Sequence, residues 1–63
     1  MTSHLLTTTD AAAALAIAPK TLRNWRSQGV GPPYIRVGSA IRYRETDLKA
    51  WVDAQVVAVG AGA

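Results

Sequence analysis

Six of the seven basic residues in this 63-residue chain lie between positions 20 and 44, a stretch that contains no acidic residue. They are Lys20, Arg23, Arg26, Arg36, Arg42 and Arg44. The stretch carries a charge of +6, whereas residues 1–19 carry −1 and residues 45–63 carry −2, for a net charge of +3. Guanidinium and ammonium groups at this density bind phosphate, so the leading candidate partner is nucleic acid. The alternative is a basic face that contacts only solvent.

Several side chains at the start of this stretch could also recognise bases if they lie on one helix. Asn forms a bidentate hydrogen bond with adenine, and Arg forms one with guanine. On a helical wheel, an arc of roughly 100° contains Lys20, Arg23, Asn24 and Ser27. Leu22 and Trp25 share the opposite side, with Thr21 beside them. We therefore predict a helix with one buried face and one cationic face. The alternative is that the polar arc is only the exposed side of an ordinary helix.

A shorter helix is predicted to precede this one. Thr7 can cap its N-terminus, and Asp10, three residues later, approximates a capping box with a shortened carboxylate. The apolar residues 11–17 would form the helix, in which Leu15 and Ile17 supply most of the buried bulk. The alanines of this stretch allow another helix to approach closely.

The second helix is predicted over residues 19–28. Pro19 suits a first helical position, and Gly29 suits a C-terminal stop. Residues 16–18 then form a tight turn between two helices, which is the spacing of a helix-turn-helix.

A β-hairpin is predicted after the Gly/Pro-rich residues 29–33. Residues 34–37 and 41–44 alternate with period two around a turn at residues 38–40. Pairing Val37 with Ile41 puts apolar side chains on one face of the hairpin.

The same register pairs Ile35 with Tyr43 and places Arg36 directly opposite Arg42, with Arg44 on that face too. Like charges opposed across a hairpin are destabilising. We therefore expect an anion to neutralise them, as a phosphate backbone beside a wing would.

A last helix is predicted to begin near Glu45. Five residues are spaced so that they would lie on one face of this helix: Leu48, Trp51, Val52, Gln55 and Val56. All of them are apolar except Gln55. We expect Trp25 and Trp51 to build the core, and the alternative is that they stack on bases.

Composition excludes several other functions. The chain has no cysteine and a single histidine, His4, so no disulfide, metal site or cofactor is expected. No nucleophile–base pair or paired carboxylate is present, so we do not expect an enzyme.

No apolar run approaches the ~20 residues of a membrane span, and no signal peptide is visible. The basic residues do not form one amphipathic helix of the membrane-binding type. We expect a cytoplasmic protein.

The length is that of one domain with marginal stability. We expect a flexible N-terminus over residues 1–5, a folded domain over residues 6–57 and a flexible tail over residues 58–63. The uncharged tail could alternatively be a weak self-association surface.

The order of these motifs is characteristic. The chain contains Leu6-Thr7, Asp10-Ala11-Ala12, Pro19 to Arg26, Gly31-Pro32-Pro33-Tyr34, Ile41-Arg42-Tyr43 and Asp47-Leu48-Lys49-Ala50-Trp51. Over roughly residues 5–52 it resembles the small helix-turn-helix proteins called excisionases, relatives of the MerR-type winged helix DNA-binding domain. The resemblance implies an α+β, mainly α fold, the winged helix-turn-helix: helix 1, helix 2, a two-stranded hairpin wing and helix 3. It also implies that the second helix enters the major groove and the wing contacts the minor groove or backbone.

Position by position, the resemblance places the DNA-binding residues on these two elements. On the second helix they are Lys20, Thr21, Arg23, Asn24 and, at its edge, Arg26, and the helical wheel adds Ser27 to this set. On the wing they are Arg36, Gly38, Ser39 and Arg42, and the predicted hairpin face adds Arg44. The chain departs from the family at Ala18, where a Ser cap is usual, and at Ala40, where a basic residue is common near the wing tip.

The resemblance implies a recombination directionality factor that binds repeated sites in double-stranded DNA cooperatively and bends it. Its partner would be an integrase, either a tyrosine or a serine recombinase, that excises a phage or mobile element. A small transcription regulator would need the same helix and wing. A protein-interaction adaptor, using residues 56–63 and the tryptophans, is the alternative from another class.

Overall fold

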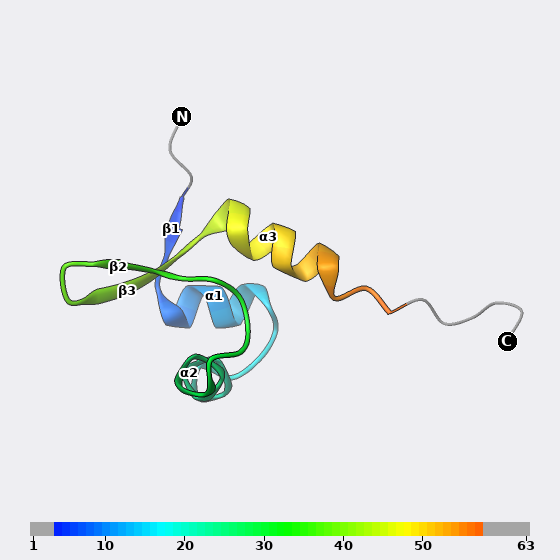
Figure 1. The fold of residues 1–63 in the computed structure, drawn as a ribbon, viewed down its shortest axis with the longest axis horizontal. Coiled ribbons are helices and arrows are strands. Elements are labelled where there is room, and N and C mark those ends of the chain that lie inside the picture. The colour runs from blue at the N-terminus through cyan, green and yellow to red at the C-terminus, as the bar shows by residue number, and fades with distance from the viewer. Residues whose placement is uncertain (1–3, 58–63) are drawn as a thin grey trace, which may run out of the picture.

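The computed structural model describes residues 4–57, which form three helices and a small three-stranded antiparallel sheet (Figure 1). The elements in chain order are β1 (Leu5–Leu6), α1 (Thr8–Ala14), α2 (Pro19–Gln28), β2 (Ile35–Val37), β3 (Ala40–Arg44) and α3 (Glu45–Ala54). This arrangement confirms the predicted α+β winged helix-turn-helix. Residues 1–3 and 58–63, which belong to the predicted flexible ends, lie outside the described residues.

Helix α1 begins at its predicted cap. The Thr7 hydroxyl accepts a hydrogen bond from the Asp10 backbone N–H at 3.0 Å. The helix ends at Ala14, before the predicted end at residue 17. The reason is local, because Ala16 adopts a left-handed conformation with φ 58°, which stops helical propagation. The Ile17 N–H then bonds back to the Ala12 carbonyl at 3.0 Å and closes the turn.

Helix α2 has the predicted bounds. Gly29 ends it with φ 75°, and two backbone hydrogen bonds close its last turn. The Gly29 N–H donates to the Arg26 carbonyl, and the Val30 N–H donates to the Trp25 carbonyl. This is the Schellman arrangement, which favours glycine at the left-handed position. At the other end, Ala18 caps α2 without a side-chain hydrogen bond.

The sheet contains one strand that the sequence did not predict. Strand β1 pairs antiparallel with β3, with Leu5 opposite Arg44 and Leu6 opposite Tyr43. The Glu45 N–H also donates to the His4 carbonyl at 2.9 Å. A strand of two residues is too short to show an alternating pattern, so a two-stranded hairpin was predicted where three strands exist.

The predicted register of the hairpin is wrong by one residue. The structure pairs Ile35 with Arg42, Arg36 with Ile41 and Val37 with Ala40. The turn therefore has two residues, Gly38 and Ser39, and Gly38 has φ 63°. A two-residue turn with glycine first matches the right-handed twist of paired strands, so it is preferred over the predicted three-residue turn.

This register removes the predicted opposition of Arg36 and Arg42. Arg36 faces Ile41 across the hairpin, so the expected repulsion between like charges does not exist. Because neighbouring residues of a strand point to opposite faces, Arg36 and Arg42 lie on different faces of the hairpin.

The apolar core lies where α1, α2, β3 and α3 meet. Its buried members among residues 4–57 are Ala11, Ala12, Leu22, Tyr43 and Leu48. Around them pack Leu6, Leu15, Ile17, Trp25 and Ile41. The fully buried alanines let α1 lie close to both α2 and β3. Tyr43 and Leu22 are the largest side chains that are fully buried.

The two tryptophans pack on each other, as a role in the core requires. The ring centroids of Trp25 and Trp51 are 5.8 Å apart, with an angle of 47° between the planes. Trp25 also contacts Gly31, where an added Cβ would lie 3.1 Å from the indole. These contacts favour the predicted structural role over base stacking.

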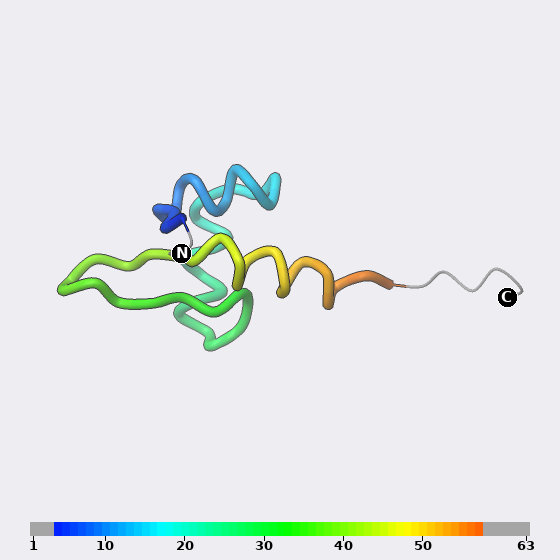
Figure 2. Tube along the Cα trace, turned by 90° about the horizontal axis from the view of Figure 1, so that it is seen from above, coloured from blue at the N-terminus to red at the C-terminus, as the bar shows by residue number. Residues whose placement is uncertain are grey.

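Only the first part of the predicted α3 stripe is buried. Leu48 is in the core, but Val52 is 42% exposed and Val56, beyond the end of α3, is 79% exposed. Figure 2 shows that α3 and the hairpin extend in opposite directions, so the end of α3 projects away from α1 and α2.

Candidate nucleic-acid interface

The polar face of α2 points to solvent. Leu22 is 1% exposed and holds the opposite face of the helix in the core. The exposed residues are Lys20, Arg23, Asn24 and Ser27. Figure 1, which views α2 nearly end-on, shows the helix at the periphery of the fold. The predicted separation of a buried and a cationic face is therefore present.

These side chains are free to bind a partner. Within residues 4–57, the side chains of Lys20, Arg23, Asn24 and Ser27 make no hydrogen bond or ion pair with the protein. A major groove presents acceptors and donors to amide and guanidinium groups in this geometry. Thr21 is half-buried and lies at the edge of the face.

The hairpin formed by β2 and β3 is the wing. Its tip, Gly38 and Ser39, is exposed, and so is Arg36. Arg42 is half-buried, and its Nη1 donates to the Ile41 carbonyl at 2.7 Å. The backbone bond leaves the Arg42 charge without a counter-ion among the described residues. The wing thus carries one uncompensated cation on each face.

The position of Tyr43 shows which face of the wing looks toward α2. Tyr43 is buried, and its hydroxyl accepts a hydrogen bond from a residue of α2. Ile41, two residues earlier, and its partner Arg36 lie on the same face of the hairpin. Arg36 therefore lies on the side of α2, whereas Arg42 and Arg44 lie on the far side. The prediction that the three arginines share one face is wrong.

Arg44 differs from the other wing residues because its charge is paired. Its Nε donates to Oδ2 of Asp47 in the first turn of α3. Both side chains are partly exposed to solvent, so the pair contributes little stability. The salt bridge nevertheless reduces the charge that Arg44 offers to a phosphate.

Arg26 is held inside the domain. Its Nη1 donates to the Thr8 hydroxyl at 3.1 Å and to the Tyr43 hydroxyl at 3.2 Å. Its guanidinium carbon lies 5.7 Å from the centre of the Tyr34 ring. The sequence does indicate that Arg26 is close to the buried face of α2. Residues four apart on a helix are about 40° apart, so Arg26 lies beside the buried Leu22. Sequence reasoning placed it at the edge of the groove and missed these contacts.

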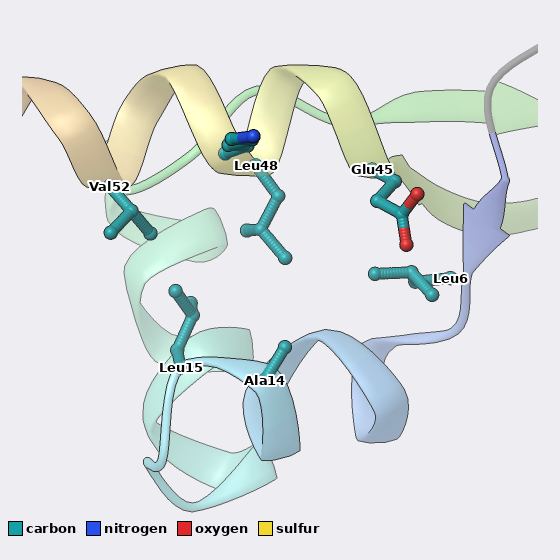
Figure 3. A pocket seen from close by; sticks show the side chains of 7 residues that line it. Leu6, Ala14, Leu15, Glu45, Leu48 and Val52 are labelled. Atoms are coloured by element: carbon teal, nitrogen blue, oxygen red, sulfur yellow. The ribbon is translucent and has the colours of Figure 1, made fainter.

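A separate apolar pocket of about 220 Å³ lies between β1, α1 and α3 (Figure 3). Its lining consists of Leu6, Ala14, Leu15, Glu45, Leu48, Lys49 and Val52. None of the predicted DNA-binding residues lines it. Within residues 4–57 there is also no cluster of three or more His, Cys, Asp or Glu side chains that could hold a metal. No described helix is long and apolar enough to cross a membrane.

Comparison with known proteins adds one finding. The family model of the helix-turn-helix domain matches residues 5–56. The match includes α2, the wing and α3. No curated protein matches the chain.

Proposed function

The chain belongs to the helix-turn-helix domain family of small DNA-binding domains, and on that premise we propose that it is an excisionase. Sequence-specific binding to double-stranded DNA follows from the family. The finer role is to direct an integrase toward excision of a phage or mobile element. The observation that best supports contact with DNA is the polar face of α2, whose side chains have no partner within residues 4–57, together with a basic wing.

The two elements have different tasks in this proposal. Helix α2 enters the major groove, where Asn24 recognises adenine and Arg23 recognises guanine. Lys20 and Ser27 contact the adjoining phosphates. The wing carries Arg36 and Arg42 on opposite faces, an arrangement suited to the two phosphate walls of a minor groove. Phosphate contacts position the domain, and base contacts select the site.

Bending is the step that serves recombination. Several copies bound cooperatively to repeated sites near an attachment site would curve the duplex and bring integrase subunits together. Bending a short site costs on the order of 1–6 kcal/mol, which the protein–DNA contacts must offset. The integrase would be a tyrosine or serine recombinase, and the complex would form on the nucleoid in a bacterial cytoplasm. The chain itself would perform no catalysis.

The test is a reconstituted excision reaction. Supercoiled DNA carrying both attachment sites of the element is incubated with the adjacent integrase, with or without this protein. We expect excised circles only when the protein is present, and footprints at repeated sites beside the crossover. Arg23→Ala should abolish stimulation, whereas Lys49→Ala, on exposed α3 away from the interface, should retain it.

The same experiment distinguishes an excisionase from the alternative, a transcription regulator. Footprints confined to a promoter, with no effect on the products of the integrase, would refute the excisionase role and leave DNA binding intact. Binding of single-base operator variants by gel shift would then define the promoter site. Stimulation that persists in Arg23→Ala would instead support a protein-interaction adaptor.

A further inference from the structure

We propose that Arg26 is a positioning residue for DNA binding: it sets the angle between α2 and the wing and does not contact DNA. The inference rests on the proposed function of these two elements. The sequence alone instead predicts that Arg26 is one of the residues that contact DNA.

One guanidinium joins three separate parts of the chain. From α2, Arg26 donates hydrogen bonds to Thr8 at the start of α1 and to Tyr43 in β3, at 3.1 and 3.2 Å. It also lies over the ring of Tyr34, just before β2, at 5.7 Å. Tyr34 in turn contacts Tyr43, with ring centroids 6.0 Å apart. The four side chains form a cluster, which we call the Arg26 brace.

The brace matters because it adds a polar link between α2 and the wing, which otherwise meet through the apolar core that contains Leu22 and Tyr43. Helix α2 packs mainly on α1, while β3 packs on α1, α3 and the other strands. The connection between α2 and β2 runs through residues 29–34, which include two glycines and two prolines. The Arg26–Tyr43 hydrogen bond and the Arg26–Tyr34 contact therefore link the groove helix directly to the wing.

The chemistry of the brace requires arginine. Arg26 is half-buried and has no acidic partner among residues 4–57. Its charge is stabilised by two hydroxyl acceptors and the face of an aromatic ring. A planar guanidinium can donate along its edge while its face lies on a ring, and the ammonium group of lysine cannot reproduce that geometry.

A fixed angle favours binding because α2 and the wing must fit adjacent grooves at the same time. Without the brace, part of the binding free energy would be used to order the two elements on the duplex. The expected loss of affinity is on the order of 10-fold. It differs from the loss of a phosphate contact, which also reduces the dependence of affinity on salt by about one unit of log–log slope.

The first experiment compares charge-conserving and charge-removing variants. Affinity of the Lys and Gln variants of Arg26 and Arg23 for a 20-bp specific duplex is measured by fluorescence anisotropy over a salt series, at a temperature where circular dichroism shows all variants folded. We expect Arg26→Lys to lose about 10-fold, and Arg26→Gln to lose a similar factor with an unchanged salt slope, whereas Arg23→Gln should also reduce the slope by about 0.9. Tyr43→Phe, which removes only a hydroxyl, should lose a similar factor, and the double variant should lose no more than either single one. Full affinity in Arg26→Lys would overturn the proposal.

A second experiment tests the brace without DNA. The chain contains no cysteine, so spin labels can be attached at Gln28→Cys, at the end of α2, and Ser39→Cys, at the wing tip. We expect a narrow distribution of label distances in the otherwise native chain and a broad one with Arg26→Gln. An unchanged distribution would refute the brace. Failure of the unmutated protein to bind any duplex would instead refute the proposed function, and the label distances would still decide the role of Arg26.

Discussion

The salt dependence of DNA binding can be predicted from which cations are available. Of the six basic residues between positions 20 and 44, Arg26 is held in the brace and Arg44 is paired with Asp47. The remaining four are Lys20, Arg23, Arg36 and Arg42. A cation inside a groove neutralises phosphate charge whether it contacts a phosphate or a neighbouring base edge, and each one contributes about −0.9 to the slope of log affinity against log salt, so four cations predict a slope of about −3.6.

This slope corresponds to a large change in affinity. Raising the salt from 50 to 200 mM should weaken binding roughly 150-fold. The assay is fluorescence anisotropy of a labelled duplex at five or more salt concentrations. Lys20→Gln should reduce the slope to about −2.7, and the matched control Lys49→Gln, which removes the same charge from α3, should leave it unchanged.

Three results would refute this reasoning. A slope near zero would show that the cationic surface does not bind phosphate. A slope near −5.4, the value for six cations, would show that Arg26 and Arg44 leave their partners in the protein to bind DNA. An equal effect of Lys20→Gln and Lys49→Gln would show that only the net charge matters.

The remaining predictions concern specificity and stability. Asn24→Ala should reduce discrimination at one base position by about 1–3 kcal/mol, whereas Arg42→Ala should weaken all duplexes alike; a panel of single-base variants distinguishes the two. Gly31→Ala should lower the free energy of unfolding in urea by about 2–4 kcal/mol, because Gly31 has φ 91° and its added Cβ would meet an indole at 3.1 Å. Gly29→Ala, with φ 75° but open space, should cost only about 1 kcal/mol, and equal losses would contradict the packing argument. Ala18→Ser should raise the unfolding free energy by about 1 kcal/mol through a new N-cap, and no gain would show that the cap does not form.

The helix-turn-helix was predictable because its signals act over a few residues. The Thr7 hydroxyl, the Pro19 ring and the missing Cβ of Gly29 each act on the backbone of their own turn. The bounds of α2 and its exposed polar face therefore agree with the sequence analysis. The end of α1 was less predictable, because alanine at position 16 carries no local signal for the left-handed conformation that it adopts.

The hairpin shows where local reasoning fails. Alternation favours the register that puts all four apolar side chains on one face, but the observed register, shifted by one residue, puts Ile35 and Val37 on the face opposite Ile41 and Tyr43. The choice depends on the glycine turn and on the contacts of Tyr43 with α1, α2 and β1, which are distant in sequence. Strand β1 also depends on contacts that are distant in sequence, because its two residues form a strand only by pairing with the edge of β3.

Amino-acid types and short spacings were thus sufficient for the fold class, the segregation of charge and the side chains that face solvent on α2. The folded chain alone determined which cations are free, because a partner such as Tyr43 or Thr8 is brought to Arg26 only by long-range packing. Charge is a property of each residue, but its availability depends on neighbours that the chain places by burying its apolar surface.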